Sequence, residues 1–99
     1  MWILESEADE VGGRFTFRVL PGAMKTIGRA PRADFIVEAP LVSRLHCRVS
    51  VTPAGQLKVQ DLKSTNGTFV NGRRVETAVL VAGDRLGVGR VQFVVTQRT

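Results

Sequence analysis

Cysteine and histidine each occur once in the sequence, as Cys47 and His46. One thiol cannot form a disulfide within the chain or supply a cysteine-based metal cluster, so we expect a reducing, intracellular setting, cytoplasmic or nuclear. One histidine without a second imidazole or thiol is also a poor basis for a metal site. Because paired carboxylates, an activated nucleophile and a catalytic triad are missing too, we expect no enzyme, no metal and no other cofactor.

Long apolar runs are equally absent. The longest is a handful of residues, far below the roughly 18 that a transmembrane helix needs, so we expect no membrane partner. The opening Met1–Glu7 lacks the cationic head and apolar middle of a signal peptide and is typical of a first strand. The 99 residues suffice for one core and are too few for two, so we expect a single domain over residues 1–99. The lack of a tail or linker suggests a module of a longer protein, and the sequence does not indicate its oligomeric state.

Aromatic residues are few, with five phenylalanines and one tryptophan. The net charge of +5 favours anionic partners, so a small basic β domain that binds nucleic acid is an alternative. Against it, the phenylalanines lie mostly in the phase of strand cores, which leaves few stacking surfaces for bases. A steep, sequence-independent salt dependence with DNA or RNA would favour this alternative. The arginines that suggest it are at positions 14, 18, 32, 48, 73, 74, 85, 90 and 98.

Apolar and polar residues alternate with a period of two in several short segments, which is typical of half-buried strands. No window of helical length carries apolar residues at helical spacing without an interrupting glycine or proline. The sequence therefore predicts an all-β fold. The alternating segments are residues 15–19, 47–51, 57–60 and 91–95.

Turn-forming residues recur at short, fairly even intervals, which predicts a sandwich or barrel of antiparallel strands. Asn71-Gly72 has the flanks of a two-residue type I′ hairpin, and we interpret it as a turn and nothing more. Asn66-Gly67 follows polar residues, so its amide side chain is free for another role. The other turn signals are Gly12-Gly13, Pro21-Gly22, Ala30-Pro31, Ala39-Pro40, Pro53-Ala54-Gly55, Gly83-Asp84, Gly87 and Gly89.

Polar residues gather at three places where apolar runs begin or end: Gly28-Arg29, Val42–His46 and Thr65–Gly67. Each place is expected to be a loop at a strand end, where binding sites are commonly built on β scaffolds. Guanidinium groups, hydroxyls and an amide on one rim form a receptor for a phosphate ester. The sequence therefore predicts a protein that captures a phosphorylated residue of a partner and does no chemistry on it.

A phosphothreonine offers nearly two negative charges, three acceptor oxygens and a γ-methyl group. Arg29 can supply a forked donor, Ser43 a hydroxyl beside backbone N–H groups, and Arg44 a second cation. Thr65 can add a hydroxyl and a methyl face. The Asn66 amide, both donor and acceptor, suits a hold on the main chain of an extended peptide.

These residues resemble the signature of the forkhead-associated (FHA) domain family. The matching elements are Gly28-Arg29, Ser43-x-x-His46 and Thr65-Asn66-Gly67, extended by the run from Asp61 to Gly72. The resemblance implies a two-sheet antiparallel β-sandwich of about eleven strands, with binding loops at one end, that recognises phosphothreonine in extended protein segments and recruits a partner in signalling or scaffolding. An FHA fold used for phosphate-independent protein interaction is the weaker alternative, because the pocket residues are intact.

By the same resemblance, the phosphothreonine-binding residues are Arg29, Ser43, Arg44, Thr65 and Asn66, and the positions that shape the loops are Gly28, His46 and Gly67. Leu41 is apolar where some members carry a charge, so it implies a preference for an apolar residue three positions after the phosphothreonine. The opening Met1-Trp2 also resembles the N-terminal FHA domain of nibrin-like proteins.

Three single residues have simpler interpretations. We interpret His46 as hydrogen-bonded within its own loop, where it would hold Ser43 and Arg44 in place. We expect Cys47 to be a small core residue, because it alternates inward with the valines that follow it. We expect Trp2 to serve in packing rather than in base stacking.

Overall fold

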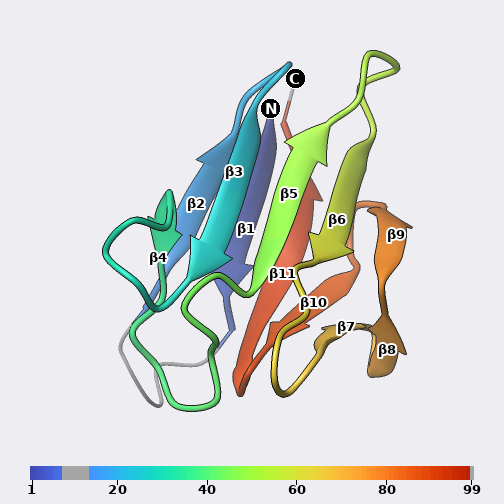
Figure 1. The fold of residues 1–99 in the computed structure, drawn as a ribbon. Helices are drawn as coiled ribbons and strands as arrows, with labels where there is room; N and C mark the ends of the chain where they lie inside the picture. Colours follow the sequence, from blue (N-terminus) through green and yellow to red (C-terminus); the bar gives the residue numbers. More distant parts are fainter. Residues whose placement is uncertain (8–13, 99) are drawn as a thin grey trace.

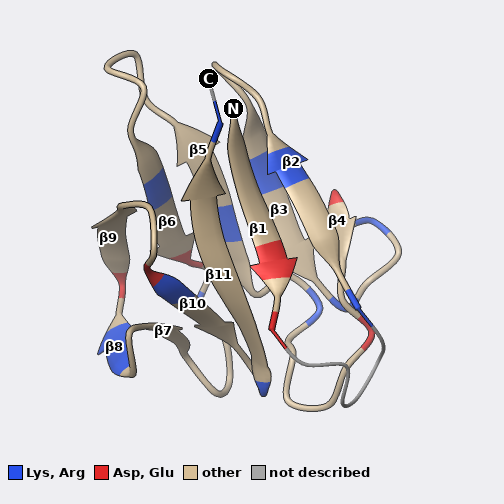
Figure 2. Cartoon of the chain, turned by 180° about the vertical axis from the view of Figure 1, so that it is seen from behind, with Lys and Arg blue, Asp and Glu red and all other residues tan. Residues whose placement is uncertain are grey.

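The computed structural model describes residues 1–7 and 14–98. They form eleven strands in two sheets that pack face to face, as Figure 1 shows and Figure 2 shows from behind. The predicted all-β sandwich is therefore confirmed, whereas the predicted turn at Gly12-Gly13 lies outside the described residues. None of the described residues forms a helix long and apolar enough to cross a membrane.

The six-stranded sheet has the order β2-β1-β11-β10-β7-β8 and the five-stranded sheet the order β4-β3-β5-β6-β9. The strands of the first sheet are β1 (Trp2–Ser6), β2 (Thr16–Val19), β7 (Thr68–Val70), β8 (Arg73–Val75), β10 (Arg85–Val88) and β11 (Val91–Gln97). Those of the second are β3 (Met24–Gly28), β4 (Phe35–Ile36), β5 (Cys47–Val51), β6 (Leu57–Asp61) and β9 (Thr77–Leu80).

The core lies between the two sheets and is built by the period of two that the sequence shows. Cys47 and Val49 of β5 belong to the same fully buried cluster as Phe93 and Val95 of β11 in the other sheet. Cys47 is thus the small core residue that was expected. Burial raises the pKa of its thiol to about 12, so the thiol stays protonated at neutral pH.

Three strands were not predicted, each for a local reason. β4 has only two residues, too few for a period to show. In β9 the outward-facing Val79 is apolar and 49% exposed, which hides the alternation. In β10 the prediction of a turn at Gly87 is wrong: Gly87 lies within the strand, where a Cβ would be 3.2 Å from the Cβ of Phe69.

One pairing departs from the antiparallel prediction, because β4 runs parallel to β3. The loop between these strands folds back so that the Asp34 carboxylate accepts hydrogen bonds from the backbone N–H and the hydroxyl of Thr26, at 2.9 and 3.1 Å. The Asp34 N–H donates in turn to the Thr26 hydroxyl. These bonds hold Asp34 beside Thr26 of β3, so that β4, which follows Asp34, pairs with the end of β3. Gly28 ends β3, and Arg29 is the first residue of the loop.

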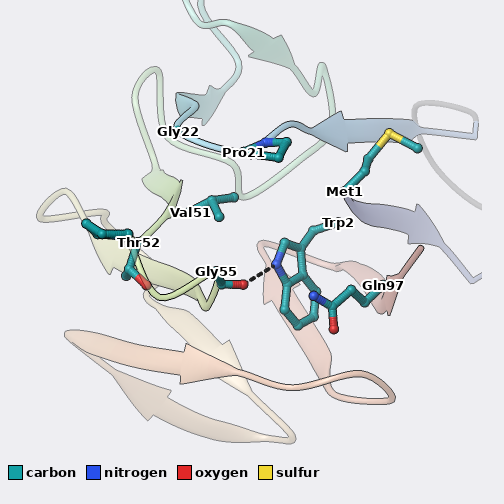
Figure 3. Close-up of a pocket in the computed structure, with 9 residues that line it drawn as sticks. Met1, Trp2, Pro21, Gly22, Val51, Thr52, Gly55 and Gln97 are labelled. Carbon is teal, nitrogen blue, oxygen red and sulfur yellow. Dashed lines mark hydrogen bonds between the residues drawn. The ribbon is translucent and has the colours of Figure 1, made fainter. Parts of the chain in front are cut away.

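The two ends of the sandwich differ in what they carry (Figure 1). One end holds both termini, where Met1 donates to the Arg98 carbonyl. Trp2 is buried there, only 6% exposed, and its indole N–H donates to the Gly55 carbonyl at 3.0 Å beside a hollow of about 470 Å³ (Figure 3). Trp2 therefore serves in packing, as predicted. The opposite end holds the loops β3–β4, β4–β5 and β6–β7, on which the candidate site residues lie.

The predicted type I′ hairpin at Asn71-Gly72 is confirmed, since φ is +51° and +82° at the two residues and Val70 pairs with Arg73. The hairpin is more than a turn, however. The Asn71 side chain donates to Asp84 at 2.9 Å and accepts from the Arg85 N–H at 2.9 Å. It therefore joins the β7–β8 hairpin to β10.

Replacing Asn71 separates these two roles. Asn71→Ala should lower the free energy of unfolding by about 1–2 kcal/mol, because alanine tolerates a positive φ poorly and makes neither side-chain hydrogen bond. Asn71→Gly should lose less, because glycine keeps the backbone conformation free of strain. Urea unfolding of both variants measures the difference, with the exposed Gln56→Ala as a neutral control. Equal losses for Ala and Gly would contradict the strain contribution.

Candidate functional site

The buried His46 imidazole connects two of the loops. The Ser43 N–H donates to His46 Nδ1 at 3.0 Å, and His46 Nε2 lies 2.8 Å from the Gly67 carbonyl. Because Nδ1 accepts a hydrogen bond, the ring proton lies on Nε2, which donates to Gly67. The backbone N–H of His46 also donates to the Ile27 carbonyl at 2.8 Å. His46 thus fixes the segment around Ser43 against β3 and against the loop that carries Thr65 and Asn66.

Arg29 is held beside Ser43 by its own backbone and by one atom of its side chain. The Arg29 N–H donates to the Ser43 carbonyl at 2.9 Å, and Arg29 Nε donates to the Val42 carbonyl at 3.1 Å. The preceding Gly28 permits this approach, since a Cβ there would lie 2.0 Å from the Arg44 carbonyl oxygen. Arg29 is exposed, and its two terminal amino groups make no hydrogen bond with the residues that the structure describes, so they can bind a ligand.

Ser43 and Thr65 lie against each other. The Thr65 N–H donates to Ser43 Oγ at 3.0 Å, which leaves the Ser43 hydroxyl hydrogen for another acceptor. The Ser43 N–H is bound to His46, so this particular backbone group is not available to a phosphate. Arg44 follows with an exposed side chain, and its carbonyl accepts from the Ala30 N–H at 3.1 Å.

Asn66 contacts the loop on the other side. One amide N–H of Asn66 donates to the Leu41 carbonyl at 3.1 Å, and the amide oxygen makes no hydrogen bond with the described residues. Leu41 itself has φ +70°, a conformation that costs a non-glycine residue about 1–2 kcal/mol. The Asn66 bond and the packing of Gly89, whose φ is +60°, against Leu41 and Val42 help to hold it there. Leu41 consequently presents a side chain that is 48% exposed at the rim.

Asp61 and Ser64 build the loop that carries Thr65 and Asn66, and the sequence reasoning gave them no role. The Ser64 hydroxyl donates to the Asp61 carboxylate at 2.5 Å and accepts from the Gly67 N–H at 2.9 Å. The Ser64 N–H and the Thr68 hydroxyl donate to the same carboxylate. An aspartate three residues before a serine is a turn signal that could have identified the pair.

Opposing effects act on the Asp61 carboxyl. Partial burial raises its pKa, but the hydrogen bonds from Ser64 and Thr68, with the nearby His46, outweigh burial and hold the pKa below its ordinary value of 3.8. The carboxylate is therefore fully ionised at neutral pH and is occupied by the scaffold.

The site therefore brings together the five residues that the sequence assigns to phosphate and peptide binding. Chains of hydrogen bonds run from Arg29 through Val42 and Ser43 to Thr65, and from Leu41 to Asn66. The arrangement offers two guanidinium groups and hydroxyls at one rim, a donor set suited to a tetrahedral anion. Within residues 1–7 and 14–98, no group of three histidine, cysteine, aspartate or glutamate side chains is placed to hold a metal ion.

Comparisons of the chain with known proteins all indicate the same protein family. The model of the FHA domain family matches residues 25–89. The chain is 41% identical over 87 residues to the ABC transporter ATP-binding/permease protein Rv1747 of Mycobacterium tuberculosis, covering 88% of this chain and 10% of that protein. It is 35% identical over 83 residues to the glycogen accumulation regulator GarA of Mycolicibacterium smegmatis, covering 84% of this chain and 50% of GarA.

A solved structure from a study of phosphothreonine-dependent FHA domain interactions superposes with a TM-score of 0.82 at 28% identity. The superposition covers 99% of this chain and 97% of that one. The chain thus matches that FHA structure along nearly its whole length, but spans half or less of the two curated relatives named above.

Gly28→Ala tests the close contact between the Gly28 backbone and the Arg44 carbonyl group. The added methyl group would meet backbone atoms, so we expect a loss of about 1–3 kcal/mol in the free energy of unfolding. We also expect shifted amide NMR signals for residues 43–46 and 65–67. Gly22→Ala is the matched control: Gly22 lines the hollow beside Met1 and Trp2, at the end of the sandwich that holds the termini (Figure 3), with φ +78° and no atom within 4 Å of an added Cβ. It should lose about 1 kcal/mol from backbone strain alone and leave those signals in place.

The lowered pKa of Asp61 predicts a loss of stability in acid. A carboxyl whose pKa is lower in the folded state stabilises the fold above its ordinary pKa of 3.8, and this contribution disappears as pH falls below that value. The free energy of unfolding should therefore fall more steeply below pH 3.8 in the parent protein than in Asp61→Asn. Denaturant titrations across the acid range measure the slopes, with Glu38→Gln as the control. A slope that Asp61→Asn leaves unchanged would refute the assignment.

Proposed function

The chain belongs to the FHA family of phosphothreonine-binding modules, and we propose that Arg29, Ser43, Arg44 and Thr65 form its phosphothreonine pocket. The observation that carries this proposal is the single rim on which the Arg29 guanidinium and the Ser43 hydroxyl meet, joined by hydrogen bonds between their own segments. The phosphothreonine-dependent FHA interactions of a structural relative support the same ligand.

Each pocket residue has a separate role in the proposal. Arg29 presents its two free amino groups to two phosphate oxygens, and Ser43 donates its hydroxyl hydrogen to a phosphate oxygen. Arg44 supplies a second positive charge. Hydrogen bonds of this charge-assisted kind contribute about 1.5–3 kcal/mol each. Thr65 lines the niche for the γ-methyl group, so phosphothreonine should bind more tightly than phosphoserine by about 0.8 kcal/mol.

Asn66 holds the main chain of the bound segment in this proposal. Its N–H bond to Leu41 fixes the amide plane, and the free amide oxygen can accept from a peptide N–H. Leu41 lies next to it as the apolar surface for a residue three positions after the phosphothreonine. An extended partner segment therefore crosses the rim from the phosphate pocket towards Asn66.

The expectations about the extent of the domain, the lack of catalysis and the location in the cell also remain proposals. We place the working domain within residues 1–99, give it a binding role without catalysis, and assign it to the inside of the cell. The functions of Rv1747 and GarA as whole proteins are not transferred, because the chain spans only 10% and 50% of them. The narrower resemblance to nibrin-like proteins gains no support from these bacterial relatives, so we do not propose it.

The nucleic-acid alternative is less well supported than the phosphopeptide proposal. Basic residues are spread over β2, β5, β6, β8 and β10 as well as the loops, rather than gathered on one face (Figure 2). Four of the five phenylalanine rings pack on one another, as in the stacked pair Phe17 and Phe35 with centroids 4.5 Å apart. Five of the six aromatic side chains are phenylalanines, and the tryptophan is buried.

Arg29→Ala tests the pocket directly. Removal of its charge-assisted hydrogen bonds should weaken binding of a phosphothreonine peptide roughly 10- to 100-fold, while thermal unfolding stays cooperative and loses only the contribution of the bond to Val42. Isothermal titration calorimetry measures the affinity, and the dephosphorylated peptide should show no binding. Arg18→Ala removes the same charge from the exposed face of β2 and should leave the affinity within about twofold. Equal binding of phosphorylated and unphosphorylated peptides would refute the proposal.

A further inference from the structure

Arg74 lies across the backbone of Gly67, next to the candidate peptide-binding residue Asn66. Gly67 is buried and has φ +93°, and a Cβ at this position would be 2.8 Å from Arg74 Nε and 3.2 Å from Arg74 Cδ. Glycine at position 67 therefore serves two purposes, since it allows the backbone conformation and leaves room for the arginine. Arg74 reaches this place from β8, where it pairs with Phe69.

The Arg74 charge is positioned but not neutralised. The residue is exposed, and its guanidinium makes no hydrogen bond or ion pair with the residues that the structure describes. The guanidinium end of the side chain, from Cδ to Cζ, lies over Gly67, and this contact limits the conformational freedom that the side chain loses when it binds a ligand. Arg85 provides the contrast, because its Nε is bound to Glu7 at 2.6 Å.

The support beneath Arg74 is rigid. The Gly67 carbonyl accepts from His46 and the Gly67 N–H donates to Ser64. The Arg74 guanidinium therefore lies over a hydrogen-bonded part of the loop that carries Asn66, separate from Arg29 and Arg44, which lie beside Ser43. Arg73 is the natural comparison: it has the same charge, pairs with Val70 and lies on the opposite face of β8.

We propose that Arg74 is a specificity-determining residue that selects an acidic side chain, Asp or Glu, in the peptide segment held by Asn66. This inference rests on the proposed function and adds a second anionic contact outside the phosphate pocket. The ligand class is then a phosphothreonine segment with a carboxylate near the modified residue. Arg74 contributes preference among phosphopeptides rather than phosphate binding itself.

A scan of peptides tests the inference. Each peptide carries one phosphothreonine with alanine flanks, and a single aspartate is moved through the positions from three before to three after it. With the parent protein, aspartate at one or more positions should tighten binding about threefold to fivefold, as a solvent-exposed ion pair would. Arg74→Gln should abolish this preference and keep the affinity for the all-alanine phosphopeptide within about twofold. Arg73→Gln should keep the preference, and Arg74→Lys should restore part of it.

The possible results separate this inference from the proposed function. Absence of an aspartate preference, or a preference that Arg74→Gln leaves intact, overturns the role of Arg74 while phosphate-dependent binding stands. An equal loss of affinity for every phosphopeptide in Arg74→Gln overturns it also, because that result indicates a purely structural arginine. Equal binding of the unphosphorylated peptide to the parent protein refutes the proposed function, and the inference fails with it.

Discussion

The hydrogen bonds of the buried His46 imidazole are the interaction on which the arrangement of the loops depends. Both ring nitrogens are used, one by the Ser43 N–H and the other by the Gly67 carbonyl. A buried polar side chain with both bonds made adds rigidity, whereas one with a bond missing costs free energy. Only a relative position of the two loops that keeps both hydrogen bonds therefore has a low free energy. Residues distant in the sequence, on the loops before β5 and before β7, become neighbours through a side chain that need not touch the ligand.

The side chains at the rim divide their polar atoms between scaffold and ligand. Arg29 uses Nε for Val42 and keeps its terminal amino groups. Ser43 uses an oxygen lone pair for Thr65 and keeps its hydrogen, and Asn66 uses one N–H for Leu41 and keeps its oxygen. The free protein thus already restricts these side chains, so that less conformational entropy is lost on binding. A positive φ at Leu41 is the strain that accompanies this arrangement.

The sequence predicted the parts of this molecule that follow from local pattern. The period of two identified β5, β6 and β11, and the Asn71-Gly72 hairpin followed from its turn chemistry. It could not reveal β10, because Gly87 within that strand resembles a turn residue unless its neighbours Phe69 and Gln92 are known. The positive φ of Leu41 and the position of Arg74 over Gly67 likewise depend on contacts between separate segments. The gathering of the candidate binding loops at one end of the sandwich was therefore predictable, and the hydrogen bonds that join them were not.

Fixed cations, rather than net charge, give such a surface its selectivity. A net charge of +5 attracts any anion, and an exposed arginine such as Arg18 on β2 adds to that attraction without choosing a ligand. Arg29 and Arg74 differ because backbone groups define their places: the Val42 carbonyl for one and the surface of Gly67 for the other. Each case also needs a glycine, since Gly28 admits the Arg44 carbonyl beside Arg29 and Gly67 admits the Arg74 side chain. In the proposed mode of binding, the glycines therefore contribute to recognition by allowing the close contacts that position these charges.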